Sequence, residues 1–172
     1  MKDLREGYYV QISGVFYQII AKEPFRYVTS SSTGEFSAVA TGSESGFQNL
    51  ENLEPDAGRL YQCFFGVADG CEYYFKVPTG TDRWGVDEDK DIGYIDNIIS
   101  PHFAPNPNFE VFLVENFYPS VNAKNNTGVS QTPKVYSEGF KFDLRDVEED
   151  EEKELLDGKR PFTIITLGGV GN

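Results

Sequence analysis

The residues best suited to binding chemistry form an acidic run in the middle of the chain. Three aspartates stand there at alternate positions, Asp87, Asp89 and Asp91, and Asp96 follows five residues later. Carboxylates spaced in this way, with a glycine such as Gly93 to let the chain turn, are typical of a calcium-binding loop. The run departs from an EF-hand, because the glycine comes one residue late and the twelfth position is Ile98 instead of glutamate. We therefore predict a Ca²⁺ site at the four aspartates, with a solvated acidic loop as the alternative.

Aromatic side chains lie in and near the same segment: Trp84, Tyr94, His102 and Phe103. Exposed aromatic rings beside carboxylates can stack on sugar rings while the acids bind hydroxyl groups. These four residues are therefore a candidate surface for a ligand or a partner. The alternative interpretation is that they pack over one end of a sheet.

Catalysis has little support in the sequence. His102 is the sole histidine, and no nucleophile is placed beside it by a motif. His/Cys zinc spacing and phosphate-binding glycine motifs are absent. The 28 acidic residues make some carboxylate pair inevitable, so such a pair is weak support for a glycosidase. We therefore predict a protein that is not an enzyme and that holds no cofactor apart from the candidate Ca²⁺.

The composition limits the classes of partner that the protein could bind. The formal net charge of −13 opposes binding to nucleic acid or to an anionic membrane surface. The first residues contain no apolar signal region, and no apolar run approaches the length of a membrane span. We expect a soluble protein made in a cytoplasm without a signal peptide.

Short aromatic runs separated by turns predict strands. The strongest signal is Tyr61 to Val77, where Asp69-Gly70 separates two apolar runs and predicts a hairpin. In that hairpin Phe65 and Phe75 would lie on opposite faces, both covered by other parts of the protein. Cys63 and Cys71 could not bridge in it, so we expect two buried free thiols.

Further strands are predicted along the chain. Tyr8 to Ile20 reads as a hairpin that turns at Ser13-Gly14 and is ended by Pro24. A weaker hairpin would join residues 25–29 to 35–40, and residues 78–108 read as one long irregular, functional or partner-contacting loop. Two later strands are predicted at residues 109–115 and 162–167.

The acidic segment 146–157 predicts one short surface helix, since acids begin it and Gly158 follows it. A disordered acidic loop is the alternative. Residues 168–172 form a glycine-rich tail. We expect residues 1–167 to form a single domain.

These patterns together predict an all-β fold, mostly antiparallel: a single-domain sandwich or barrel of short hairpin-linked strands, with long loops and one short acidic surface helix. The acidity, the proline-rich loop and the tail suit a structural or assembly protein, a subunit of a larger complex. Our leading example is a viral (phage) virion accessory, such as a capsid decoration or a head–tail component, with other protein subunits as partners in a homo-oligomer or a capsid or tail lattice. The alternative is a calcium-stabilised carbohydrate-binding β module.

Overall fold

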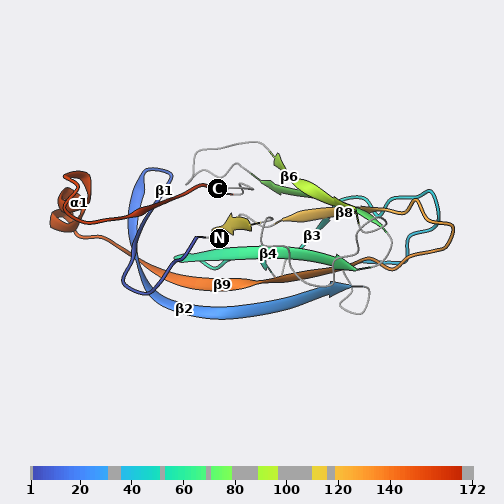
Figure 1. Cartoon of the computed structure of the whole chain (residues 1–172), viewed down its shortest axis with the longest axis horizontal. Coiled ribbons are helices and arrows are strands. Elements are labelled where there is room, and N and C mark those ends of the chain that lie inside the picture. Colours follow the sequence, from blue (N-terminus) through green and yellow to red (C-terminus); the bar gives the residue numbers. More distant parts are fainter. Residues whose placement is uncertain are drawn as a thin grey trace.

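The computed structural model shows an elongated molecule made of two β-sheets, with a short helix at one end (Figure 1). It describes residues 2–30, 36–50, 53–68, 71–78, 89–96, 110–115 and 119–167. The elements, in chain order, are β1 (Tyr9–Ile12), β2 (Val15–Ser30), β3 (Gln48–Asn49), β4 (Arg59–Ala68), β5 (Glu72–Pro78), β6 (Asp89–Asp96), β7 (Glu110–Leu113), β8 (Ser120–Lys124), β9 (Lys134–Asp146), α1 (Glu149–Leu156) and β10 (Thr163–Ile165).

The larger sheet has six strands in the order β10-β1-β2-β9-β4-β7, and the smaller has four in the order β3-β8-β5-β6. All the strand pairs are antiparallel except β1 with β10, which is parallel. The sheets are open, so the fold is an all-β sandwich and not a barrel. The predicted fold class is confirmed, including the one short helix.

The first predicted hairpin is confirmed by the register. Ile12 pairs with Val15, which leaves Ser13 and Gly14 as a two-residue loop. Both loop residues have positive φ, 49° and 82°, which matches the twist of the flanking strands. Val10 and Ile12 are fully buried in the main core, on one face of the hairpin.

The sequence predicted that Pro24 ends this hairpin, and that prediction is wrong. Strand β2 continues through Pro24 to Ser30 and pairs with β9 over almost all of its length. Strand β1 pairs only with residues 15–18 of β2, so at Pro24 the other side of β2 has no described partner strand. A proline fits in such a strand when its missing N–H faces the side that has no partner strand. Residues 25–29 therefore pair with β9, and their predicted hairpin with 35–40 is wrong.

The predicted hairpin at Asp69-Gly70 is also wrong, although both of its strands exist. Strand β4 pairs with β7 and β9 in the larger sheet, whereas β5 pairs with β6 and β8 in the smaller sheet. Phe65 and Phe75 are both buried, as predicted, but they face each other across the two sheets. Crossing between the sheets lets each ring fill the space inside the sandwich, where a local hairpin would have separated them onto opposite faces.

Strands β4 and β9 approach each other unusually closely at Gly139. A Cβ atom on Gly139 would lie 1.8 Å from the carbonyl oxygen of Gln62, well inside van der Waals contact. Gly139 pairs with Phe25 on one side and with Cys63 on the other. The centre of the larger sheet therefore requires a residue without a side chain at this position.

The N-terminal segment packs against one face of the larger sheet, at Gln62 and Glu110. The Gln62 side-chain amide, which is buried, donates hydrogen bonds to the backbone carbonyl of Lys2 at 2.8 Å and to the Glu110 carboxylate at 2.9 Å. The backbone N–H of Lys2 donates to the same carboxylate at 3.2 Å. Leu4, two residues after Lys2, is fully buried in the main core. The segment thus brings both apolar and polar contacts to this face.

Helix α1 is the predicted short acidic helix, and Gly158 follows its end as predicted, whereas the capping box at its start was not predicted. The Glu148 side chain accepts a hydrogen bond from the third helical residue, and the Glu151 side chain accepts one from the backbone N–H of Glu148, which is a capping box. At the other end Gly158 has φ of 73°, and Gly158 N–H and Lys159 N–H donate to Leu155 and Glu154 carbonyls. Leu155 is the buried residue of the helix.

The segment 78–108 is not one irregular loop. Residues 89–96 form β6, which pairs with β5 across a register shift between Phe75 and Lys76. Cys63 and Cys71 are buried and form no disulfide, as predicted. Within the described part of the chain, no helix has the length and apolarity needed to cross a membrane.

Candidate binding site

Strand β10 forms one edge of the larger sheet. It pairs on one side with β1, in a register that places Gln11 opposite Ile164 and Ile12 opposite Ile165. On its other side, no strand of the described residues pairs with it. A free strand edge presents backbone donors and acceptors that another strand can use.

The two faces of β10 differ. Ile165 points into the sandwich and is buried in the main core. Ile164, on the opposite face, is 61% exposed. Two residues earlier, Phe162 is 38% exposed and makes an edge-to-face contact with Phe16, with ring centroids 4.9 Å apart. The outer face of this edge therefore presents an apolar strip formed by Phe162 and Ile164.

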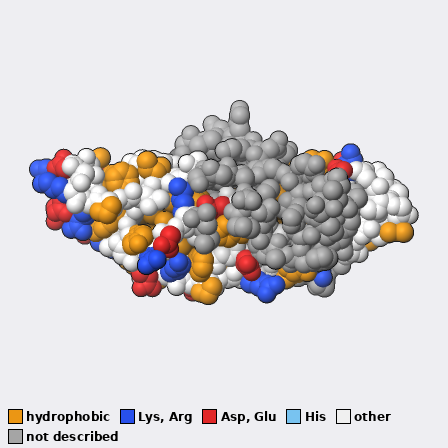
Figure 2. Space-filling model, viewed as in Figure 1, with side chains coloured by type: hydrophobic (Ala, Val, Ile, Leu, Met, Phe, Trp, Pro, Cys, Tyr) orange, Lys and Arg blue, Asp and Glu red, His pale blue; other side chains and the backbone are white. Residues whose placement is uncertain are grey.

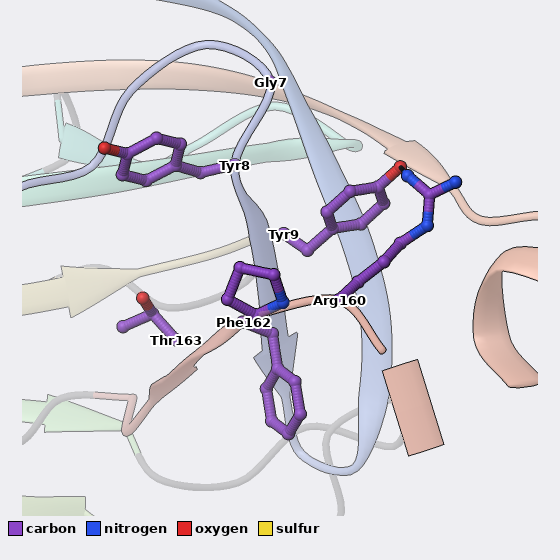
Figure 3. Close-up of a pocket in the computed structure, with 7 residues that line it drawn as sticks. Gly7, Tyr8, Tyr9, Arg160, Phe162 and Thr163 are labelled. Carbon is purple, nitrogen blue, oxygen red and sulfur yellow. Dashed lines mark hydrogen bonds between the residues drawn. The ribbon is translucent and has the colours of Figure 1, made fainter. Parts of the chain in front are cut away.

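A cavity of about 500 Å³ lies at the start of this edge, between the beginnings of β1 and β10. It is lined mainly by Tyr8, Tyr9, Arg160, Pro161, Phe162 and Thr163. In Figure 3, Tyr8 and Tyr9 point in opposite directions from the start of β1, and the Arg160 side chain extends along the Tyr9 ring to its hydroxyl group. Aromatic and proline rings thus form most of the walls, and this volume is in the range of small-ligand or side-chain pockets.

One wall of the cavity is held rigid by a polar network. The Tyr9 hydroxyl donates a hydrogen bond to Glu151 Oε2 at 2.6 Å. Arg145 forms a bidentate ion pair with the same carboxylate, with N–O distances of 3.0 and 2.7 Å. Arg160 donates to Tyr9 Oη at 3.0 Å and pairs with Glu154. Tyr9 also packs with Phe16 and Leu155 in a second small core. These contacts hold α1 against the sheet beside the cavity.

The network shifts the titration of its members. Hydrogen bonds from Arg145 and Tyr9 lower the pKa of Glu151 from 4.5 to about 2. The hydrogen bond that Tyr9 donates to Glu151 raises the pKa of Tyr9. Glu151 is therefore ionised and Tyr9 neutral at neutral pH, so the phenol can donate its proton to a charged carboxylate. The two arginines of the wall are each paired with a carboxylate, which leaves the cavity mainly apolar.

The space-filling view shows the same separation of charged and apolar side chains. In Figure 2 the tip that carries α1 is rich in charged side chains, and several hydrophobic side chains are exposed between that tip and the middle of the molecule. Tyr8 is among the exposed large apolar residues, at 42%.

A second cavity, of about 360 Å³, is lined by residues between Phe36 and Gln48. Its polar groups already bond within the protein. Ser45 Oγ accepts from the Ala123 N–H at 2.9 Å, and the Gln48 amide donates to the Ser45 carbonyl at 3.1 Å. This cavity is smaller than the first one, and its lining is more polar.

The calcium site predicted from the sequence remains a prediction. Asp87 lies outside the described residues, and Asp89, Asp91 and Asp96 are described only as backbone within β6. Among the described residues, no cluster of three or more His, Cys, Asp or Glu side chains could hold a metal ion.

The aromatic surface predicted from the sequence also remains a prediction. Trp84, His102 and Phe103 lie outside the described residues, and Tyr94 is described only as backbone within β6.

Sequence reasoning did not predict the site at β10. It identified the strand at residues 162–167 and the strand beginning at Tyr8, but it did not pair them. One signal was available, since residues 161–167 carry no charge in a chain with 25% charged residues. An uncharged strand with high β-propensity is a feature that proteins usually avoid on an open edge.

The fold and the site define an all-β, sandwich-like protein with an open apolar edge. No protein-family model, curated protein or solved structure matches the chain.

Proposed function

We propose that the protein is a non-enzymatic assembly subunit that binds other protein chains through the edge formed by β10. The observation that supports this function most strongly is that, in the described part of the chain, no strand pairs with that edge. Native edge strands are commonly shielded by charges, bulges or covering segments. Strand β10 carries no charge, and Ile164 is largely exposed on it.

The cavity adds a second feature suited to a protein partner. The cavity lies beside the start of β10, on the side of β1, so a part of the partner chain beyond the paired strand would place an apolar side chain in it. Main-chain hydrogen bonds along the edge then supply affinity, and the cavity supplies specificity. The Tyr9 and Arg160 contacts keep its wall in place before the partner arrives.

The virion accessory remains our leading example of such a subunit, and no feature of the described residues bears on it. The calcium-stabilised carbohydrate module also remains a prediction, because its ligands lie in the part of the chain without described side chains.

The test compares native complexes formed by tagged full-length chains in the cells that make the protein. We expect the wild-type chain to elute from a sizing column in a complex well above its own 19.3 kDa mass. Ile164→Glu places a charge on the edge without touching the core, so it should release the chain as a monomer.

Val129→Glu is the matched control for this variant. Val129 is 63% exposed and belongs to the connection between β8 and β9. Figure 1 shows this connection at the end of the molecule opposite α1. It should leave the complex intact. A wild-type chain that is monomeric under all conditions, or an Ile164→Glu variant that stays in the complex, would overturn the proposed function.

A further inference from the structure

We infer that the partner at this edge is a second copy of the same chain, paired antiparallel through β10 about a two-fold axis at Ile164. This inference rests on the proposed function and specifies its partner. It follows from the charge of the edge, the direction of the pairing and the face on which Ile164 lies.

Charge determines where two copies can meet. The chain has a formal net charge of −13, so two copies repel each other over most of their surfaces. Residues 158–167 contain no aspartate or glutamate, and 161–167 contain no charged residue. This edge is therefore a place where a second copy can approach without opposing carboxylates.

Charge also determines the direction. A parallel, in-register pairing would place Arg160 beside its own copy and bring the two acidic α1 helices to the same end. An antiparallel pairing centred on Ile164 places the two Arg160 residues beyond opposite ends of the paired segment. Four strand residues span about 13 Å, so the two arginines are about 26 Å apart. That separation is well beyond the screening length of about 8 to 10 Å, so the repulsion is small.

The exposed face supplies the apolar contact. A two-fold axis at Ile164 makes this residue its own cross-strand partner, so the two isoleucine side chains lie against each other on the outer face. Phe162 lies on the same face, two residues away, and extends the contact on both sides. The larger sheet then continues from one copy into the other.

The interface is small. A strand pair of this length buries less than a standard interface of about 1,600 Å², so we expect a dimer that dissociates on dilution. Detection therefore requires both a mass measurement over a range of concentrations and a covalent trap.

Ile164→Cys provides the trap. In an antiparallel pair the two Cα atoms at a shared position are about 4.5 or 5.5 Å apart. Both separations fall in the disulfide range of about 4.4 to 6.8 Å. The two natural cysteines are buried and do not compete. Val129→Cys is the control, because Val129 is equally exposed but lies away from the edge.

The experiment uses the purified full-length chain alone. We expect light scattering to show a mass that rises toward twice the monomer mass with concentration in the wild type, and to stay at the monomer mass in Ile164→Glu. We expect Ile164→Cys to form a disulfide-linked dimer under mild oxidation at least tenfold faster than Val129→Cys. Circular dichroism of each variant checks that the fold is retained.

The two proposals fail in different ways. A purified chain that stays monomeric, with Ile164→Cys cross-linking no faster than Val129→Cys, would overturn the second-copy inference. If Ile164→Glu still released the chain from its cellular complex, the edge would bind a different protein and the proposed function would stand. If neither experiment responded to changes at Ile164, both proposals would be wrong.

Discussion

The rings of Phe65 and Phe75 lie with their centroids 5.0 Å apart and are inclined at 33°, one on each sheet of the sandwich. Both side chains are buried. Because β4 and β5 do not pair, this contact joins the two sheets across the core.

The Phe65–Phe75 contact should show direct energetic coupling. We expect each Phe→Leu substitution to lower the free energy of unfolding by about 1 to 2 kcal/mol, because a buried ring is replaced by a smaller side chain. The double variant should lose less than the sum, with a coupling of about 0.5 to 1 kcal/mol. Denaturant unfolding measures all four proteins. Phe65→Leu combined with Leu155→Ala, in the separate core beside α1, should be additive; equal coupling in both pairs would refute a specific ring contact.

Gly139 should tolerate no side chain. Gly139→Ala places a methyl group against the Gln62 carbonyl, so β4 and β9 must separate locally. We expect a loss of at least about 2 kcal/mol of stability, measured by denaturant unfolding. Gly128→Ala is the matched control, because nothing lies within 4 Å of a Cβ atom at that position. Similar stabilities for the two variants would contradict the close approach of the strands.

The Glu151 carboxylate should stabilise the protein in a defined pH window. Folding lowers its pKa from 4.5 to about 2, so its contribution is fully present above pH 4.5 and is lost as the pH falls toward 2. Glu151→Gln removes the charge but can retain the capping box. We expect its melting temperature to lie below that of the wild type at neutral pH, with the gap closing in acid. A Glu151→Gln gap that is constant with pH would argue against the ion pair.

The two thiols should be unreactive in the folded protein. Burial raises the pKa of Cys63 well above its usual value, and Cys71 is also buried. We expect a thiol reagent to label neither residue at pH 8 without denaturant, and both in denaturant, as followed by absorbance. Val129→Cys should add one thiol that reacts at once. Rapid labelling of the native wild type would mean that the core around β4 opens easily.

Local features of the structure were predictable from the sequence. Ser13-Gly14 specified its turn because both residues accept positive φ, and Glu148, Glu151 and Gly158 specified the ends of α1. The apolar runs around Phe65 and Phe75 predicted two buried strands, and residues 161–167 showed by composition that this strand lacks protecting charges. Each of these depends on residues close together in the chain.

The tertiary structure decided which strands lie side by side. The sequence predicted that β4 pairs with β5, yet packing places them in different sheets. The sequence also gave no sign that β1 and β10, some 150 residues apart, lie side by side. Alternation along a strand specifies which side chains are buried but does not specify which strand lies beside it. That choice depends on the packing of all the strands at once, as at Gly139, where the fit of two backbones becomes visible only when they meet. The sequence by itself therefore determined the β character, the turns and the uncharged edge segment, while the sandwich, its strand order and the cavity at β10 came from the tertiary structure.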